Sequence, residues 1–127
     1  MSEAAAPFHV WIISSQHWPR ALLRAELIER EYEVDAFEEI GQALAALGDR
    51  RRRRPSLILL ELIEQPLTGI DLSNLQHASV PVIAMGRAVD LLSLEEAYPW
   101  AAVLRRPYSI DDVCLIVGSF ASPPPSE

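Results

Sequence analysis

Short apolar segments recur along the chain, and longer segments with helical periodicity separate them. Residues 8–13, 57–62, 80–85 and 101–104 are mostly apolar, and residues 32–37 alternate between apolar and polar side chains. A short run that is apolar throughout is typical of a strand covered on both faces, as in a parallel sheet. We therefore predict five strands, each followed by a helix.

The first helix is predicted from its apolar spacing and its start signal. Pro19 lies in the first turn, where a missing N–H costs little. The apolar stripe consists of Leu23, Leu27 and Ile28, and Arg20 is expected to face water on the opposite side.

The remaining helices are predicted in the same way. Ser109 caps the last helix, with Asp112 three residues on as its capping-box partner. The other three helices are predicted at residues 38–47, at residues 69–77 as a short helix at best, and at residues 89–97.

Strand and helix alternate five times, which predicts one α/β domain over residues 8–121. We predict a doubly wound, five-stranded parallel sheet of the flavodoxin-like type, with strand order 2-1-3-4-5. Residues 1–7 and 122–127 are predicted to be flexible termini. Function in such folds lies at the carboxyl ends of the strands, and the residues there are Ser14, Ser15, Phe37, Glu61, Gly86 and residues 105–107.

Charge separates one segment from the rest of the chain. The formal net charge of −7 argues against general nucleic-acid binding, because phosphates are repelled. Arg50–Arg54 nevertheless concentrates positive charge before the third strand, at the end of the sheet opposite the functional edge. This run is interpreted either as a polyanion or nucleic-acid contact or as a solvated loop in an acidic protein, and we favour the loop because no aromatic residue is interleaved.

Other reactive residues do not form a recognisable site. His9, His17 and His77 are scattered, so no metal site is predicted. Cys114 is the one cysteine, and its apolar neighbours indicate a small buried side chain and not a nucleophile. The chain shows no signal peptide and no apolar run long enough to cross a membrane, so a cytoplasmic location is predicted.

At the strand ends the chain resembles the receiver domain of bacterial response regulators, the chemotaxis receivers among them. The resemblance covers about residues 8–121. Receivers have a Gly eight residues after the phosphoacceptor Asp, and here Gly69 follows Glu61 by eight. The matching segments are VWIISS at 10–15, PSLILLELIEQPLTGIDL at 55–72, VPVIAMG at 80–86 and RRPY at 105–108.

The resemblance implies that the Mg²⁺ and acceptor positions have been altered. Ser14 and Ser15 replace the acidic pair of the family, and Glu61 replaces the acceptor. Mg²⁺ prefers carboxylate oxygens in octahedral geometry, and phosphoryl transfer depends on positioning. We therefore expect a degenerate, atypical pseudo-receiver that binds no cofactor or metal and is not phosphorylated.

The switch positions are altered as well. Gly86 replaces the hydroxyl that contacts the phosphoryl group in the family, and Arg106 replaces the invariant Lys. Val103 stands where a switching aromatic often lies. The resemblance also implies a cis bond at Arg106-Pro107.

Two interpretations of Glu61 and Arg106 remain open. Their pair either imitates the phosphorylated state or is a residual ion pair that satisfies a half-buried acid, and we favour the ion pair because Glu carries one charge where a phosphate carries nearly two.

Tyr98, Trp100 and Tyr108 are candidates for an interaction face. Receivers commonly use the fourth helix, fifth strand and fifth helix for dimers and partners, and exposed aromatic residues are enriched at interfaces. The other interpretation is that these rings close the edge of the core.

The sequence therefore predicts a phosphorylation-independent signalling module without enzymatic activity. It is expected to bind another signalling protein or a second copy of itself, because no output domain follows the fifth helix. The alternatives are a polyanion binder through Arg50–Arg54 and a small-ligand sensor that uses the emptied pocket.

Overall fold

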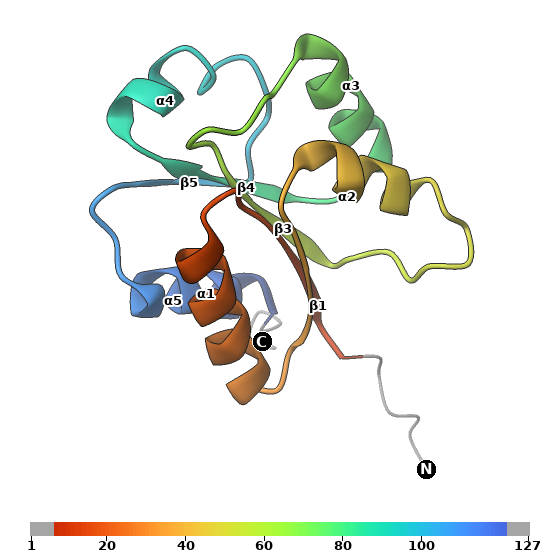
Figure 1. Ribbon diagram of the computed structural model, residues 1–127, viewed down its shortest axis with the longest axis vertical. Helices are drawn as coiled ribbons and strands as arrows, with labels where there is room; N and C mark the ends of the chain where they lie inside the picture. The colour runs from red at the N-terminus through yellow and green to blue at the C-terminus, as the bar shows by residue number, and fades with distance from the viewer. Residues whose placement is uncertain (1–6, 122–127) are drawn as a thin grey trace, which may run out of the picture.

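The computed structural model describes residues 7–121. The termini predicted to be flexible therefore lie, apart from Pro7, outside the described residues. Within the described part the chain folds into two helical layers around one sheet (Figure 1).

The sheet has five parallel strands in the order β2-β1-β3-β4-β5, as predicted. Every residue of β1, β3 and β4 is buried, because these central strands are covered on both faces. The apolar runs in the sequence therefore mark the centre of the sheet. The strands are β1 (His9–Ile13), β2 (Glu33–Phe37), β3 (Leu57–Glu61), β4 (Val82–Gly86) and β5 (Ala102–Arg105).

The helices divide between the two faces of the sheet. Figure 1 shows α1 and α5 together on one face, with α2, α3 and α4 on the other. Each face has its own apolar core, since successive strand residues point to opposite sides. No helix in the described part is long and apolar enough to span a membrane. The helices are α1 (His17–Glu29), α2 (Ile40–Leu47), α3 (Gly69–Ala78), α4 (Ala88–Leu92) and α5 (Ile110–Ala121).

The predicted apolar stripe of α1 was wrong at one position. Leu23 and Leu27 are buried, but Ile28 is 44% exposed. Adjacent helical residues point about 100° apart, so a residue next to Leu27 turns away from the sheet. Arg20 was predicted to face water, but it is half-buried and donates a hydrogen bond to the carbonyl of Ser14.

Three helices differ in length from the prediction. α2 begins at Ile40 and not at residue 38. The helix predicted at 69–77 as short at best extends one residue further, and α3 has 10 residues and a capping box between Thr68 and Asp71. The helix predicted at 89–97 ends at Leu92. After it, the Leu94 carbonyl accepts hydrogen bonds from the backbone of Ala97 and the indole of Trp100, so the helical ladder does not continue.

The start of α5 follows the prediction. The Ser109 hydroxyl accepts from the Asp112 backbone at 3.0 Å, and the Asp112 carboxylate accepts from the Ser109 backbone at 2.9 Å. The Arg106-Pro107 bond that precedes it is cis, as predicted. The connection from β5 to α5 places Arg106 and Tyr108 at the functional edge of the sheet, where both donate to Glu61.

Candidate functional site

Ser14, Glu61 and Met85 lie at the carboxyl ends of three adjacent strands. Glu61 pairs with Met85 across β3 and β4, and Ser14 follows β1, which is the neighbour of β3 on the other side. Ser14 and Glu61 are both buried, and Glu61 is only 3% exposed. A carboxyl group this deeply buried needs hydrogen-bond partners.

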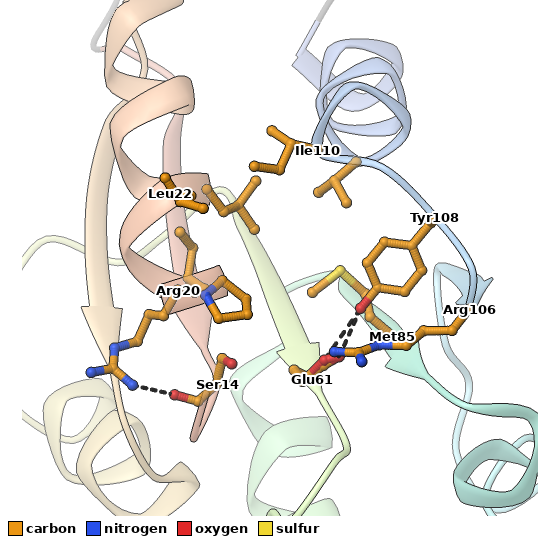
Figure 2. A pocket seen from close by; sticks show the side chains of 12 residues that line it. Ser14, Arg20, Leu22, Glu61, Met85, Arg106, Tyr108 and Ile110 are labelled. Carbon is orange, nitrogen blue, oxygen red and sulfur yellow. Dashed lines mark hydrogen bonds and ion pairs between the residues drawn. The ribbon is translucent and has the colours of Figure 1, made fainter. Parts of the chain in front are cut away.

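The partners of Glu61 come from the connection between β5 and α5. The Tyr108 hydroxyl lies 2.7 Å from Oε2 and 3.2 Å from Oε1 of Glu61, and it donates to the carboxylate. The Arg106 guanidinium donates to Oε2 at a longer 3.4 Å. Figure 2 shows both side chains converging on Glu61. The structure therefore brings Glu61 and Arg106 together, as predicted, and adds Tyr108 as the closer partner.

Burial governs the protonation of this group. Desolvation raises the pKa of Glu61 above its ordinary value, although the Tyr108 hydrogen bond and the Arg106 charge act in the opposite direction. Burial and the Glu61 charge also raise the pKa of Tyr108, so its hydroxyl keeps its proton and remains a donor.

The direction of the Glu61 shift predicts a dependence of stability on pH. Because the pKa of Glu61 is raised in the folded protein, protonation of Glu61 stabilises the folded state relative to the unfolded chain. This stabilisation is fully present below the ordinary pKa of about 4.5 and is lost as the pH rises through the pKa of the folded state. E61Q removes this loss. We expect the free energy of unfolding of E61Q, relative to the wild type, to increase from pH 4 to pH 7 in urea titrations.

A control separates this effect from net charge. E64Q removes an exposed carboxylate three residues away and is expected to show no comparable increase. If E61Q instead loses stability relative to the wild type between pH 4 and pH 7, the ionised carboxylate is favourable and the account of its burial is wrong.

The hydroxyls of Ser14 and Ser15 are hydrogen-bonded to backbone groups. Ser14 Oγ accepts from the Gln16 backbone at 3.2 Å, and the Ser14 carbonyl accepts from Arg20 at 2.7 Å. Ser15 Oγ donates to the Ile63 carbonyl at 3.0 Å. These bonds stabilise the turn between β1 and α1 and join it to the loop after β3.

The donor set at this edge does not fit Mg²⁺. Glu61 is the one carboxylate among the three positions matched to the Mg²⁺ ligands of receivers, and its oxygens are held by Tyr108 and Arg106. Within residues 7–121 no three His, Cys, Asp or Glu side chains are grouped so that they could hold a metal. A hard divalent cation requires several oxygen ligands, which this edge does not supply.

The switch positions lie on the other side of Glu61. A Cβ at Gly86 would meet the Cβ atoms of Asp90 and Leu62 at 3.5 Å, an ordinary contact, so space alone does not require glycine. Asp90 is held by Arg87 at 2.7 and 2.9 Å, and this bonding lowers the Asp90 pKa. Val103 is half-buried and packs against the core on the α2, α3 and α4 face.

The three candidate interface aromatics do not form one cluster. Tyr98 and Trp100 contact each other with ring centroids 4.5 Å apart and ring planes tilted by 43°, and they belong to the core on the α2, α3 and α4 face. Tyr108 packs against the core of the opposite face and points to Glu61. Sequence reasoning missed this role of Tyr108, because a Tyr next to an X-Pro bond gives no signal of its direction.

Most of the Arg50–Arg54 run is paired with groups of the chain itself. It lies before β3, at the amino end of the sheet, as predicted. Arg51 pairs with Asp49, Arg52 with Asp35 at 3.5 Å, and Arg53 with Glu33, and Arg54 donates to the Ala78 carbonyl. These pairings reduce the positive charge available to a polyanion.

His9 and Cys114 lie apart from the functional edge, whereas His17 begins α1 and its Nδ1 lies 3.4 Å from Arg20. His9 is buried at the amino end of β1, and its Nε2 lies 2.8 Å from an Asp35 carboxylate oxygen. Cys114 is buried in the α1 and α5 core, as predicted, and burial raises the pKa of its thiol.

No protein-family model and no curated protein sequence matches the chain. Solved structures do match. One is described as a transiently phosphorylated "switch" in bacterial signal transduction. It is 25% identical, with a TM-score of 0.71, and the alignment covers 91% of this chain and 94% of that one. The chain has the receiver-domain fold.

Two further neighbours show how widely this receiver fold is shared. The receiver domain of NtrX from Brucella abortus is 18% identical, with a TM-score of 0.71 over 88% of this chain and 97% of that one. An adenylate cyclase structure from Rhodopirellula baltica is 15% identical, with a TM-score of 0.76 over 91% of this chain and 88% of that one. At these identities the likeness shows the fold alone.

Proposed function

We propose that this receiver domain is a phosphorylation-independent module that signals in the bacterial cytoplasm by binding another protein. The observation that carries the proposal is the state of Glu61. At the position of the phosphoacceptor, the side chain is buried and its oxygens are hydrogen-bonded to Tyr108 and Arg106. A group held in this way is a structural acid and not an open nucleophile.

The chemistry of phosphoryl transfer supports the same conclusion. The transfer depends on positioning of the nucleophile and on neutralisation of charge by a metal ion. Here the hydroxyls of Ser14 and Ser15 are bonded to the backbone of the turn after β1 and of the loop after β3, and they supply no carboxylate. Neither requirement is met by the residues at this edge.

The Glu61 and Arg106 pair is better described as a residual ion pair than as an imitation of phosphate. Its 3.4 Å separation is long, and the Arg106 side chain is 38% exposed. The shorter Tyr108 bond does most to satisfy the buried acid. We infer that the module has one signalling state and is regulated by the presence of its partner.

The proposed contact surface is the face formed by α4, β5 and α5. Val89 and Leu92 on α4 are exposed, and Leu92 is 82% exposed. Leu115 on α5 is exposed as well. Tyr98 and Trp100, in the segment between α4 and β5, pack against each other. Exposed apolar side chains over a rigid support are suited to a protein interface.

A capture experiment tests the proposal. The immobilised chain is incubated with lysate of its source organism, once in chelator and once with Mg²⁺ and acetyl phosphate. We expect the same partner, or a second copy of the chain, to be retained under both conditions. L92E should lose at least tenfold in affinity, whereas I70E on α3 is a matched control with an equally exposed apolar residue. Retention only with Mg²⁺ and acetyl phosphate would sink the proposal.

No enzymatic activity is proposed. The adenylate cyclase neighbour shows the fold alone at 15% identity. Nucleotide cyclisation needs charge stabilisation at phosphates, and residues 7–121 contain no group of three His, Cys, Asp or Glu side chains that could hold a metal ion for it.

A further inference from the structure

A cavity of about 220 Å³ lies between α1 and α5, above the ends of β1, β3 and β4. An engineered apolar cavity of about 150 Å³ is large enough to bind benzene. The cavity at this edge can therefore hold a small organic molecule, and the proposed signalling function does not use it.

The walls of the cavity are apolar. Pro19, Leu22 and Leu23 line it from α1, and Ile110 and Val113 line it from α5. Figure 2 shows Leu22 and Ile110 on opposite sides of the space. Binding sites for small molecules commonly combine such walls with a few polar groups at one end.

The polar residues that line the cavity gather at the carboxyl ends of the strands. They are Ser14, Arg20, Glu61, Arg106 and Tyr108, and the Arg20 guanidinium is turned to the carbonyl of Ser14. In Figure 2 Arg20 and Arg106 lie on either side of the Ser14 and Glu61 edge. Each guanidinium has five N–H donors, and few of them are engaged here.

The charge of this end discriminates between ligand classes. Glu61 is already bonded to Tyr108 and Arg106, so a cationic head would meet two arginines and an occupied carboxyl group. An anionic head would find unused donors on both arginines. The buried Glu61 can also take up a proton as a second anion approaches, which limits the repulsion.

We propose that this cavity binds a small amphiphile with a single carboxylate head. Its apolar body lies between α1 and α5, and its head lies between Arg20 and Arg106. This inference does not depend on the proposed partner binding, because it uses α1 and the inner side of α5 and not the exposed face of α4.

Calorimetric titration with octanoate tests the site directly. Octanoate, 1-heptanol and heptylamine share the same alkyl chain and differ only in the head group. We expect saturable one-site binding of octanoate, at least tenfold tighter than binding of the alcohol or the amine. Equal or tighter binding of either neutral or cationic analogue would overturn the carboxylate assignment, and absence of saturable octanoate binding would overturn the site.

Variants locate the binding. I110W and L22W each fill the cavity from one wall, so one variant remains informative if the other fails to fold. Each should reduce octanoate binding at least tenfold. A dispersed NMR spectrum shows that the variant is folded. R106Q should weaken binding about tenfold. R105Q is the control, because Arg105 is exposed, pairs with Glu95 and does not line the cavity. Octanoate binding that persists in both folded Trp variants, or equal weakening by R105Q and R106Q, would contradict the proposed site.

Discussion

The S14D/S15D variant is expected to lose about 3 kcal/mol or more of stability in chelator and to regain much of it when Mg²⁺ is added. Ser14 is buried beside Glu61, and the penalty for each uncompensated buried ion is several kcal/mol. With Glu61 the two new side chains provide three carboxylates, a donor set that suits Mg²⁺. Mg²⁺ at 100 times its dissociation constant would stabilise the folded state by about 2.7 kcal/mol. Urea titrations in chelator and in Mg²⁺ measure both effects.

The S73D/S119D variant is the matched control. It adds the same two charges on the exposed surfaces of α3 and α5, where surface substitutions change stability by about 0.5 kcal/mol. The wild type and this control should show no stabilisation by Mg²⁺ beyond the general effect of salt. A comparable rise in the wild type would mean that the native edge already binds the cation, contrary to the donor set described above.

W11A is expected to lower the free energy of unfolding by about 3–5 kcal/mol. This loss is a large part of the total free energy of unfolding of a domain of this size. Trp11 is fully buried in β1, and its ring lies 4.9 Å from that of Phe37 at the end of β2. Removing the indole leaves a cavity next to the strand that positions Ser14. The loss is measured by urea unfolding followed by circular dichroism.

W18A serves as the control for this substitution. Trp18 is 70% exposed on α1, so its removal should change stability by about 0.5 kcal/mol or less. A loss below about 1 kcal/mol in W11A, or equal losses in the two variants, would show that the described packing around β1 is wrong.

The positions of the strands could be predicted because buried strands have a recognisable apolar sequence. A strand covered on both faces must be apolar at every position, and the segments at 57–62 and 80–85 are apolar nearly throughout. The single exception in the first segment, Glu61, marked the functional edge. The exposure of Ile28 was mispredicted because an apolar side chain can face water without preventing the fold.

The contacts within the site could be predicted only in part. The pairing of Glu61 with Arg106 followed from two opposite charges at the carboxyl ends of β3 and β5, the two strands that flank β4. The approach of Tyr108 depends on the path of the chain between β5 and α5. The end of α4 is followed by a local turn in which Ala97 and Trp100 donate to the Leu94 carbonyl. The cavity arises from the spacing of α1 and α5, which no local pattern encodes.

The most direct test of the central claim is an NMR titration of the ¹⁵N-labelled chain with beryllofluoride and Mg²⁺, with an ordinary phosphorylatable receiver domain as the control for the reagent. Beryllofluoride occupies the phosphoryl position on an acceptor aspartate. The account predicts no change in the resonances of Ser14, Glu61 and Arg106 under conditions that saturate the control. A saturable, Mg²⁺-dependent shift of those three resonances would contradict it and would make the chain an ordinary phosphorylated receiver.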